Sequence, residues 1–265
     1  MEQKIQVLID SEKCAGCGSC VADCQRRVLE IQGGKAVVAN SHCLKCGHCL
    51  AICPANAVTL AGYRDEIVTM PGHAVFLNEK DFMTHLKFRR SIRQYKDAPV
   101  EKEKLEKIIE AGRITPTASN MQNVRYIILQ DDREAVEDEV LAMYKSHSDL
   151  SDALSARMKI PVSAVHERLK RGFLFHKAPA VILAISQSEI NACLAAMNME
   201  LAAETLGLGA VYVGLFTRPA NENKKLREWL GIADDESIAA CLALGYPNVQ
   251  YFRSAPRKEA NVIWR

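Results

Sequence analysis

Cysteine is the residue type whose spacing carries the most chemical information in this sequence. The chain has 265 residues and ten cysteines, and eight of the ten fall within the first 53 residues. They form two runs of the pattern C-x2-C-x2-C-x3-C, and the second run repeats the first with a shift of 29 residues. The first run is Cys14, Cys17, Cys20 and Cys24, and the second is Cys43, Cys46, Cys49 and Cys53. Two sets of four thiols at this spacing indicate metal or cluster binding rather than disulfides.

This spacing is that of bacterial ferredoxins, in which it binds 4Fe–4S clusters. Three thiolates on a tight loop can face one cube of iron and sulfide, whereas the fourth, on the following helix, points away and binds the other cluster. Zinc is the alternative, but zinc sites usually pair two cysteines with two distant ligands. We therefore expect two crossed ligand sets: Cys14, Cys17, Cys20 and Cys53 on one cluster, and Cys43, Cys46, Cys49 and Cys24 on the other.

The residues around the two runs fit this interpretation. Gly16, Gly18 and Gly47 remove side chains where backbone N–H groups must approach the sulfides, and such hydrogen bonds raise the reduction potential. The second run ends in Cys53-Pro54, as the motif prefers, whereas Gln25 follows the first. The last two cysteines, Cys193 and Cys241, lie in apolar stretches, and we expect both to be buried, inert thiols.

The apolar patterns predict the elements that position these cysteines and a second domain. In residues 1–62, apolar runs at 28–31 and 57–60 each predict a short strand after a cysteine-bearing turn and helix. Residues 63–84 lack a sustained period and predict a connector. For residues 85–265 the patterns predict helices over 101–112, 161–176 and 189–206, and strands over 124–129, 180–185, 209–216 and 238–244. This mixture predicts an α+β or α/β second domain.

Composition and charge argue against several classes of protein. Lys and Arg total 34 against 32 acidic residues, so a formal charge of +2 gives no reason to expect a nucleic-acid partner or an anionic membrane surface. No stretch approaches the ~20 apolar residues of a membrane helix. The N-terminus lacks the apolar core of a signal peptide. We therefore expect a cytoplasmic protein without nucleic-acid or membrane partners, in which thiols stay reduced.

Four segments of the second domain have residue types suited to a phosphorylated cofactor. The first is Arg-Arg-Ser-Ile-Arg at residues 89–93, whose guanidinium groups suit a phosphate. The second is the polar loop at residues 116–123. The third is the glycine-containing stretch at residues 207–216, which follows a predicted helix and therefore is not a Rossmann fingerprint. The fourth is the C-terminal tail, with Arg253 and Arg257.

Taken together and in this order, these segments resemble the nitroreductase family of FMN enzymes. The resemblance covers about residues 85–265. With the cysteine repeat included, the chain resembles nitroreductase-family proteins that have an N-terminal ferredoxin domain. The resemblance implies a small ferredoxin-like domain followed by an α+β sandwich, and an intertwined homodimer with FMN sites at its interface.

The resemblance also implies which residues would contact FMN. Arg89, Arg90, Ser91 and Arg93 would hold the ribityl and phosphate groups, together with Arg253 and Arg257. Thr117, Ala118, Asn120 and Gln122 would reach the flavin from the partner subunit. Val213, Gly214 and Leu215 would place backbone N–H groups near the reactive nitrogen of the ring. No catalytic side chain is implied, because the family usually takes protons from solvent.

Residues 131–178 match none of the family's segments that we identify. Their basic side chains predict one basic helix with a solvated face, with a lid over the flavin as the alternative. These side chains are Arg157, Lys159, Arg168, Lys170 and Arg171.

The expected function is a flavin reductase in which the clusters receive electrons from a ferredoxin or a similar donor and pass them to FMN. Reduced FMN would then reduce a small organic acceptor, such as a nitroaromatic or a quinone. Clusters carry single electrons, and a flavin accepts two, so the two cofactors divide the task. One alternative is an NAD(P)H-dependent nitroreductase with the clusters as a relay. Another is a non-catalytic electron-transfer or redox-sensing protein.

Overall fold

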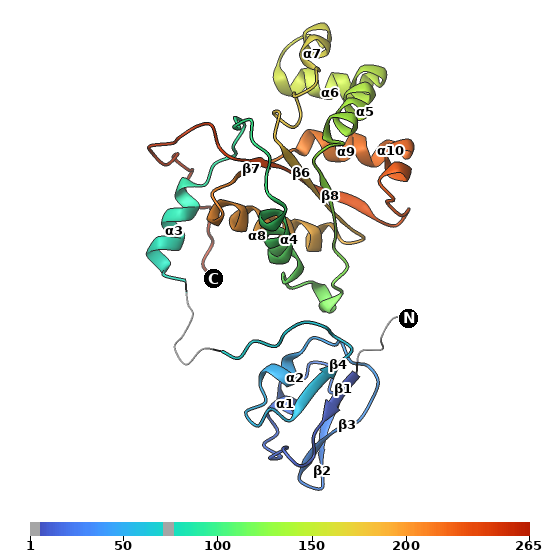
Figure 1. Ribbon diagram of the computed structural model, residues 1–265, viewed down its shortest axis with the longest axis vertical. Helices are drawn as coiled ribbons and strands as arrows, with labels where there is room; N and C mark the ends of the chain where they lie inside the picture. Colours follow the sequence, from blue (N-terminus) through green and yellow to red (C-terminus); the bar gives the residue numbers. More distant parts are fainter. Residues whose placement is uncertain (1–5, 71–76) are drawn as a thin grey trace. The chain divides into compact units, whose positions relative to one another are not determined.

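The computed structural model of the protein describes residues 6–70 and 77–265 (Figure 1). The chain divides into two compact units. The first contains the residues up to 76 together with Thr117–Met121, and the second contains Leu77–Pro116 and Gln122–Arg265. The predicted connector, residues 63–84, includes this division, and its residues 71–76 lie outside the described part of the chain.

The first unit consists of two small antiparallel sheets and two one-turn helices, and each helix follows a cysteine loop. One sheet pairs β1 with β4, and the other pairs β2 with β3. The strands β2 and β4 confirm the two short strands predicted after the cysteine runs. The elements are β1 Gln6–Ile9, α1 Ser19–Ala22, β2 Leu29–Gln32, β3 Lys35–Val38, α2 His48–Ala51 and β4 Val58–Ala61.

Glycine is required at specific points of the cysteine loops. Gly18 and Gly47 precede α1 and α2 with φ of 77° and 78°, a left-handed conformation that glycine adopts without steric cost. Gly16 also has a positive φ, and a Cβ atom there would lie 2.0 Å from the carbonyl oxygen of Gly34 in the β2–β3 hairpin. The first cysteine loop therefore packs directly under this hairpin.

The second unit is built on a four-stranded antiparallel sheet with the strand order β5-β6-β8-β7 (Figure 1). Each of the four strands begins within one residue of its predicted start. Their bounds are β5 Arg125–Leu129, β6 Ala180–Ser186, β7 Gly209–Tyr212 and β8 Ser237–Gly245.

Helices cover both faces of this sheet. Along β6, alternate side chains enter different cores: Ile182 packs with the core formed by α4 (Lys102–Arg113) and α8 (Glu189–Thr205), whereas Leu183 packs with the core on the opposite face. Successive side chains of a strand point to opposite faces, so burial on both sides requires an uninterrupted apolar run. All seven residues of β6 are buried, which explains the continuous apolar stretch in the sequence.

The core on the second face is formed by the sheet together with side chains from residues 136–178, which lie in the segment without a family match, and from residues 213–232. Within residues 6–70 and 77–265, no helix is both long enough and apolar enough to cross a bilayer. The remaining helices are α3 Glu79–Phe88, the 3-10 turn η1 Ala118–Asn120, α5 Arg133–Ser146, α6 Ser148–Met158, α7 Val162–Arg168, α9 Gly214–Glu222 and α10 Lys224–Trp229.

The helix predicted over residues 161–176 is too long. α7 ends at Arg168, and the chain then turns through Gly172, whose φ is 87°. The buried carboxylate of Glu137 on α5 accepts hydrogen bonds from the backbone N–H groups of Gly172, Leu174 and Phe175 at 2.7, 2.7 and 3.1 Å. These donors are satisfied outside a helix, so the amphipathic pattern of the sequence does not extend α7.

The strand predicted over residues 209–216 is also too long, because β7 ends at Tyr212 and α9 begins at Gly214. The N–H of Val213 still donates to the carbonyl of Cys241 on β8 at 2.8 Å, whereas the N–H of Phe216 donates back to Val213 at 3.0 Å. This strand-to-helix turn places the N-terminus of α9 at the end of the edge strand.

α3 begins inside the stretch predicted as a connector. The side chain of Asn78 accepts a hydrogen bond from the N–H of Asp81 at 3.1 Å and caps the helix. None of the residues of α3 is buried, which explains why its sequence carries no apolar period.

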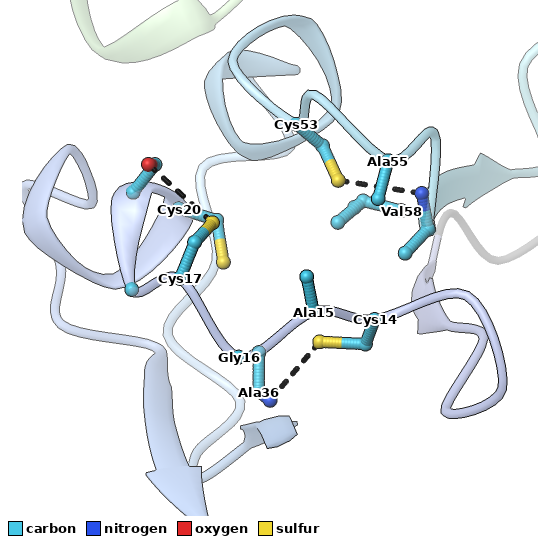
Figure 2. Close-up of a pocket in the computed structure, with 12 residues that line it drawn as sticks. Cys14, Ala15, Gly16, Cys17, Cys20, Ala36, Cys53, Ala55 and Val58 are labelled. Atoms are coloured by element: carbon cyan, nitrogen blue, oxygen red, sulfur yellow. Dashed lines mark hydrogen bonds between the residues drawn. The ribbon is translucent and has the colours of Figure 1, made fainter. Parts of the chain in front are cut away.

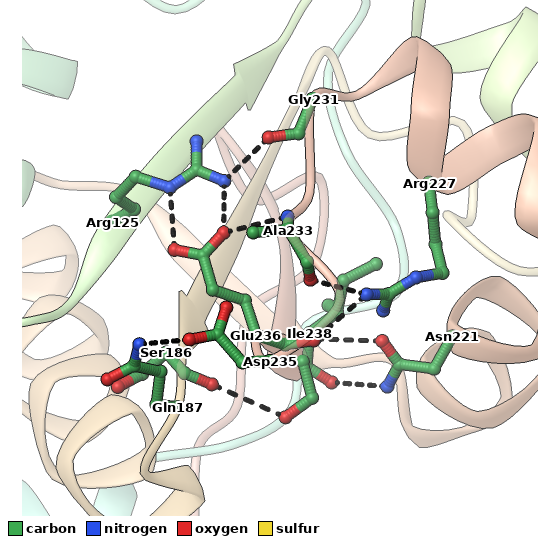
Figure 3. A network of polar contacts seen from close by, with 11 residues as sticks. Arg125, Ser186, Gln187, Asn221, Arg227, Gly231, Ala233, Asp235, Glu236 and Ile238 are labelled. Carbon is green, nitrogen blue, oxygen red and sulfur yellow. Dashed lines mark hydrogen bonds and ion pairs between the residues drawn. The ribbon is translucent and has the colours of Figure 1, made fainter.

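A polar network closes the turn that leads into β8 (Figure 3). The guanidinium of Arg125 on β5 binds the carboxylate of Glu236 in a bidentate manner, with Nε–Oε1 and Nη2–Oε2 distances of 2.9 and 2.7 Å. Arg125 also donates to the carbonyl of Gly231 at 2.9 Å. The same side chain thus fixes the α10–β8 turn against the outer strand of the sheet.

Candidate functional site

The structure places Cys53 with Cys14, Cys17 and Cys20 around one pocket of the first unit (Figure 2). Cys14 and Cys17 lie on the loop before α1, Cys20 lies within α1, and Cys53 follows α2. The rest of the lining consists of glycine, serine and small apolar residues from the first loop, β3 and the start of β4. These four cysteines are the set that the crossed arrangement predicts for one cluster.

Hydrogen-bond donors surround the sulfur atoms of this set. The N–H of Ala36 lies 3.4 Å from Cys14 Sγ, and the N–H of Ala57 lies 3.3 Å from Cys53 Sγ. Cys17 Sγ is 3.5 Å from the hydroxyl of Ser19. The donors around Cys14 and Cys17 lower the pKa of both thiols, with Ala36 and Ser19 as the largest causes. The thiolate is the form that binds iron, so these contacts favour ligation.

The second set has similar contacts on its loop and at the end of the other helix. The N–H of Lys45 lies 3.2 Å from Cys43 Sγ, and the N–H of Val28 lies 3.3 Å from Cys24 Sγ. Cys49 is partly buried, which raises its pKa to about 11, and the nearby Cys43 and Cys46 contribute to this shift. Three members of the set are therefore neighbours, whereas the place of Cys24 among them stays a prediction.

The donor set fits iron–sulfur clusters better than it fits a single ion. Among residues 6–70 and 77–265, no group of three or more Cys, His, Asp and Glu side chains is arranged to hold one metal ion. In a 4Fe–4S cube each thiolate binds a different iron atom, so the sulfur atoms must stand apart around the cube rather than converge on a point. The four cysteines of the first set surround a pocket and so meet this requirement. The N–H donors near their sulfur atoms are also typical of cluster ligands.

The arginine-containing segment 89–93 is fixed against the edge of the sheet in the second unit. The N–H of Ile92 donates to the carbonyl of Ala210 on β7 at 3.0 Å. A Cβ atom at Gly209 would lie 2.3 Å from Ile92 Cγ1, so only glycine allows this approach. The hydroxyl of Tyr95 donates to the carbonyls of Ile92 and Ala243 at 2.6 and 3.0 Å. The segment consequently runs beside the strand that leads to the β7–α9 turn.

The individual arginines of this segment have different surroundings. Arg89 Nη1 donates to Glu200 Oε1 at 2.6 Å, and the Glu200 side chain on α8 is 2% exposed. The guanidinium of Arg90 lies 5.7 Å from the ring centroid of Tyr251, which brings the start of the C-terminal tail to this site. Arg93 is exposed, and its Nη1 lies 3.4 Å from the carbonyl of Ser91.

The remaining predicted flavin contacts are distributed over several parts of the structure. Gly214 and Leu215 lie in the first turn of α9, where backbone N–H groups have no partner within the helix, whereas the N–H of Val213 is bonded to Cys241. Arg253 and Arg257 are exposed in the tail. Their contacts with a flavin stay predictions.

The segment Thr117–Met121 groups with the first unit. The side-chain amide of Asn120 donates to the carbonyls of Leu44 and Lys45, both at 3.1 Å. Ser119, Asn120 and Gln122 all have positive φ, which marks a tightly turned loop. Segment 117–121 thus contacts the loop of the second cysteine set through Asn120. The contact of Thr117, Ala118, Asn120 and Gln122 with a partner subunit's flavin stays a prediction.

Three acidic or basic residues near Arg89 were not predicted from the sequence. Besides Glu200, the carboxylate of Glu204 lies 2.9 Å from Nε2 of His85, and burial raises the pKa of Glu204. A signal was present, because Glu200 is a charged residue within the mainly apolar buried stripe of α8. His176 was also missed: it is half-buried, and burial together with the nearby Arg93 lowers its pKa.

Two further predictions differ from the structure. Cys193 is exposed rather than buried, although its Sγ lies 3.9 Å from the carbonyl of Ala239 on β8, whereas Cys241 on β8 is buried as predicted. The basic residues of the 131–178 segment do not share one helix: they lie on α6, on α7 and on the turns that follow them. Arg171 forms ion pairs with Glu134 and Asp138, as expected for a solvated face.

Comparisons with known proteins assign both units. Residues 86–246 match the nitroreductase family, and residues 6–54 match the 4Fe-4S dicluster domain. A provisionally named NADH dehydrogenase/NAD(P)H nitroreductase of Archaeoglobus fulgidus is 31% identical over 160 residues, which are 60% of this chain and 81% of the relative. Ferredoxin-2 of Desulfomicrobium norvegicum is 58% identical over 31 residues, which are 12% of this chain and 52% of that protein.

A solved structure supports the same fold. The crystal structure of a nitroreductase with bound FMN from Bacteroides fragilis superposes with a TM-score of 0.57 at 18% identity, covering 71% of this chain and 99% of that chain. This likeness confirms the predicted α+β fold. The chain therefore belongs to the nitroreductase family and carries a 4Fe-4S dicluster domain ahead of its family domain.

Proposed function

We propose that this protein is an FMN-dependent oxidoreductase in which two 4Fe–4S clusters relay electrons from a ferredoxin or a similar donor to FMN. Reduced FMN would reduce a small organic acceptor such as a nitroaromatic or a quinone. The observation that carries this proposal is the pocket at which Cys53 joins Cys14, Cys17 and Cys20, in a chain whose residues 86–246 belong to the nitroreductase family.

The two clusters are assigned to crossed ligand sets. The first cluster is held by Cys14, Cys17, Cys20 and Cys53, and the second cluster by Cys43, Cys46, Cys49 and Cys24. The clusters supply one-electron chemistry, and the chain's contribution is to direct N–H and hydroxyl groups at the sulfur ligands. Such contacts stabilise the thiolates and tune the reduction potential.

FMN is assigned to the surface formed by segment 89–93, the β7–α9 turn and the start of the tail. The flavin supplies two-electron chemistry. Arg90 and Arg93 would bind the phosphate, and the ion pair with Glu200 would orient Arg89 toward the ribityl chain. The N–H groups of Gly214 and Leu215, at the positive end of α9, would donate hydrogen bonds to the flavin ring.

The long helix α8 supports the proposal of a homodimer. Ile190, Leu194 and Met197 recur on one side of it and are 73%, 51% and 38% exposed. An apolar stripe of this spacing is the face by which a helix normally packs against another element. We propose that a second copy of the chain covers this stripe.

Anaerobic reduction of the purified holoprotein tests the proposed electron donor. We expect reduced ferredoxin to bleach the flavin, and a nitroaromatic added afterwards to restore its absorbance. A variant that loses the first cluster, Cys20→Ser, should lose the bleaching by ferredoxin, whereas Cys193→Ser, which changes an exposed cysteine outside both sets, should keep it. Bleaching by ferredoxin that does not depend on the clusters would contradict the relay.

NAD(P)H as the donor is the second candidate, because the relative from Archaeoglobus fulgidus carries NAD(P)H in its name. The chain offers no dinucleotide fingerprint at Gly207–Gly209, which follows helix α8 rather than a strand. A nicotinamide would therefore have to bind over the flavin. Flavin bleaching by NAD(P)H at the same rate in wild type and Cys20→Ser would favour this candidate.

A further inference from the structure

The two cysteine repeats allow a position-by-position comparison of the surroundings of the two proposed clusters, because they are related by a shift of 29 residues. Some contacts are the same in both. The N–H four residues after the last cysteine of each run lies 3.3 Å from its sulfur, from Ala57 to Cys53 and from Val28 to Cys24. These matched hydrogen bonds act equally on the two clusters.

The position two residues after the second cysteine differs. In the first repeat it is Ser19, whose hydroxyl lies 3.5 Å from Cys17 Sγ. In the second repeat it is His48, whose Nδ1 instead lies 3.1 Å from the carboxylate of Asp23. A hydroxyl next to a thiolate ligand donates to it and stabilises negative charge on the cluster. The first cluster has this contact, and at the second cluster the corresponding side chain is directed at a carboxylate.

The β2–β3 hairpin adds two further contacts to the first repeat only. Lys35 Nζ donates to the carbonyl of Cys14 at 2.6 Å, and the N–H of Ala36 lies 3.4 Å from Cys14 Sγ. In the second repeat, the carbonyl of Lys45 accepts from two neutral groups, the hydroxyl of Tyr63 and the amide of Asn120, both at 3.1 Å. The hairpin therefore adds an ammonium group at the carbonyl of Cys14, whereas the two donors at the carbonyl of Lys45, two residues after Cys43, are neutral.

The charge of Lys35 acts more strongly than the other cations near the cysteine loops. Lys35 is half-buried under the hairpin, whereas Lys45 and Arg64, which lies 29 positions after Lys35, are both exposed. Exposed charges are screened by water and salt, whereas a partly buried charge keeps more of its effect. One ligand of each cluster, Cys17 or Cys46, is exposed, so solvent reaches both clusters.

Adding an electron makes a 4Fe–4S cluster more negative, so nearby donors and cations favour its reduced form. Two ligands of the first cluster, Cys14 and Cys20, are buried, with 8% and 7% exposure, and this burial disfavours the more negative reduced form. In the second repeat, the N–H of Lys45 lies 3.2 Å from Cys43 Sγ and favours reduction of the second cluster. The Ser19 hydroxyl, the Ala36 N–H and the partly buried ammonium group of Lys35 together outweigh this single donor and the burial of the first cluster.

We propose that Ser19 and Lys35 give the first cluster a higher reduction potential than the second. When the two clusters together hold one electron, that electron then resides mainly on the first cluster. This inference rests on the proposed pair of clusters. The exchange moves one electron, oxidising the second cluster by one unit and reducing the first, and it makes or breaks no bond. Ser19 and Lys35 are positioning residues, because they act through the ligands.

A potentiometric titration followed by electron paramagnetic resonance tests the inference on anaerobically purified holoprotein. We expect two reduction steps that differ by at least about tenfold in electron occupancy, which is about 59 mV for one electron. Ser19→Ala and Lys35→Gln should each lower only the higher of the two potentials, and Lys35→Arg should restore it. Lys13→Gln, which removes an exposed lysine paired with Asp10 beside the same loop, should change neither.

The outcomes separate the inference from the function on which it rests. Two clusters with equal potentials, or a shift of the lower potential in Ser19→Ala, would overturn the inference and leave the relay intact. Iron analysis of each variant shows whether its clusters are complete, and Ser19→Ala removes only one oxygen atom, so it preserves the fold. A wild-type protein without two reducible clusters would overturn both the inference and the proposed function.

Discussion

At the scale of single residues, the first question is which cluster each of Cys24 and Cys53 binds. If the ligand sets are crossed, Cys24 belongs with Cys43, Cys46 and Cys49 rather than with its neighbours in sequence. We therefore expect Cys24→Ala to damage the second cluster and Cys53→Ala to damage the first, starting from about eight iron atoms and eight sulfides per chain. Iron and sulfide analysis with electron paramagnetic resonance of both variants measures this. Loss of the first cluster in Cys24→Ala would reverse the pairing.

The affinity of the protein for FMN should depend on Arg93, which is proposed to bind the phosphate group. Charge-assisted hydrogen bonds of this kind contribute ~1.5–3 kcal/mol each. Arg93→Ala should consequently weaken FMN binding by roughly ten- to a hundredfold, and Arg93→Lys should recover only part, since an ammonium group cannot reproduce the guanidinium fork. Fluorescence titration of the apoprotein at low and high salt gives the affinities.

The matched control for Arg93 is Arg171→Ala, which removes an exposed arginine of the same unit that is paired with Glu134 and Asp138. It should leave FMN affinity unchanged. If Arg93→Ala also leaves the affinity unchanged and only slows reaction with ferredoxin at low salt, the arginine guides the donor and does not hold the phosphate.

Residues whose role follows from spacing along the chain could be predicted from the sequence, whereas residues whose role follows from tertiary contact could not. The grouping of Cys53 with Cys14, Cys17 and Cys20 around one pocket could be predicted because the spacing of the motif restricts the geometry. The exposure of Cys193 was not accessible, because it depends on which side of α8 faces the sheet. The bond from Val213 N–H to Cys241 likewise depends on the pairing of β7 with β8.

At the scale of elements, the limits of regular structure follow from where backbone donors find partners. The apolar spacing of residues 161–176 suits a helix. The carboxylate of Glu137, however, accepts hydrogen bonds from three backbone N–H groups that start at Gly172, and this contact holds the chain in a turn. That carboxylate lies on another helix, so local sequence does not reveal it. By contrast, the sheet strands were predictable, because burial on both faces imposes a continuous apolar run on β6.

Glu137→Gln tests whether the Glu137 carboxylate stabilises the turn at residues 172–175. The amide keeps the shape but loses the charge that strengthens three hydrogen bonds in a buried site, so we expect the second unit to lose ~1–3 kcal/mol of stability. Glu139→Gln, which changes a partly exposed glutamate paired with the exposed Lys225, should lose far less. Urea unfolding followed by the fluorescence of Trp229 and Trp264, both in the second unit, measures the difference. Equal midpoints for the two variants would show that the loop is held by other contacts.

The network of Figure 3 predicts a pH dependence for the turn before β8. The hydrogen bonds from Arg125 hold the pKa of the Glu236 carboxyl below its usual range. A depressed folded-state pKa contributes stability above the unfolded value of about 4.3, and this contribution is lost as the pH falls through the folded-state value.

Glu236→Gln should therefore lower the free energy of unfolding by about 1 kcal/mol at pH 7, a value reduced because Arg125 is partly exposed. The difference from wild type should shrink below about pH 4. Urea titrations at several pH values measure it, and a difference that stays constant with pH would contradict the assignment.

At the scale of the whole molecule, the unpaired apolar stripe of α8 predicts a homodimer. Light scattering of the flavin-loaded protein should give about twice the chain mass of 29.4 kDa. Leu194→Asp should shift the protein toward monomer, because it places a charge in an interface that depends on apolar burial. Lys102→Asp, at an exposed position at the start of α4, is the matched control and should remain dimeric. A flavin-loaded monomer in the wild type would exclude an FMN site that needs residues from both subunits.

The central claim is that electrons from the donor reach the flavin through the two proposed clusters. Rapid mixing of anaerobic holoprotein with reduced ferredoxin, with freeze-quenched electron paramagnetic resonance and flavin absorbance recorded over the same time course, tests it most directly. We expect the electron paramagnetic resonance signals of the reduced clusters to appear first and the flavin to bleach as these signals decay. Flavin that bleaches before the clusters are reduced, or at an unchanged rate in Cys20→Ser, would contradict it.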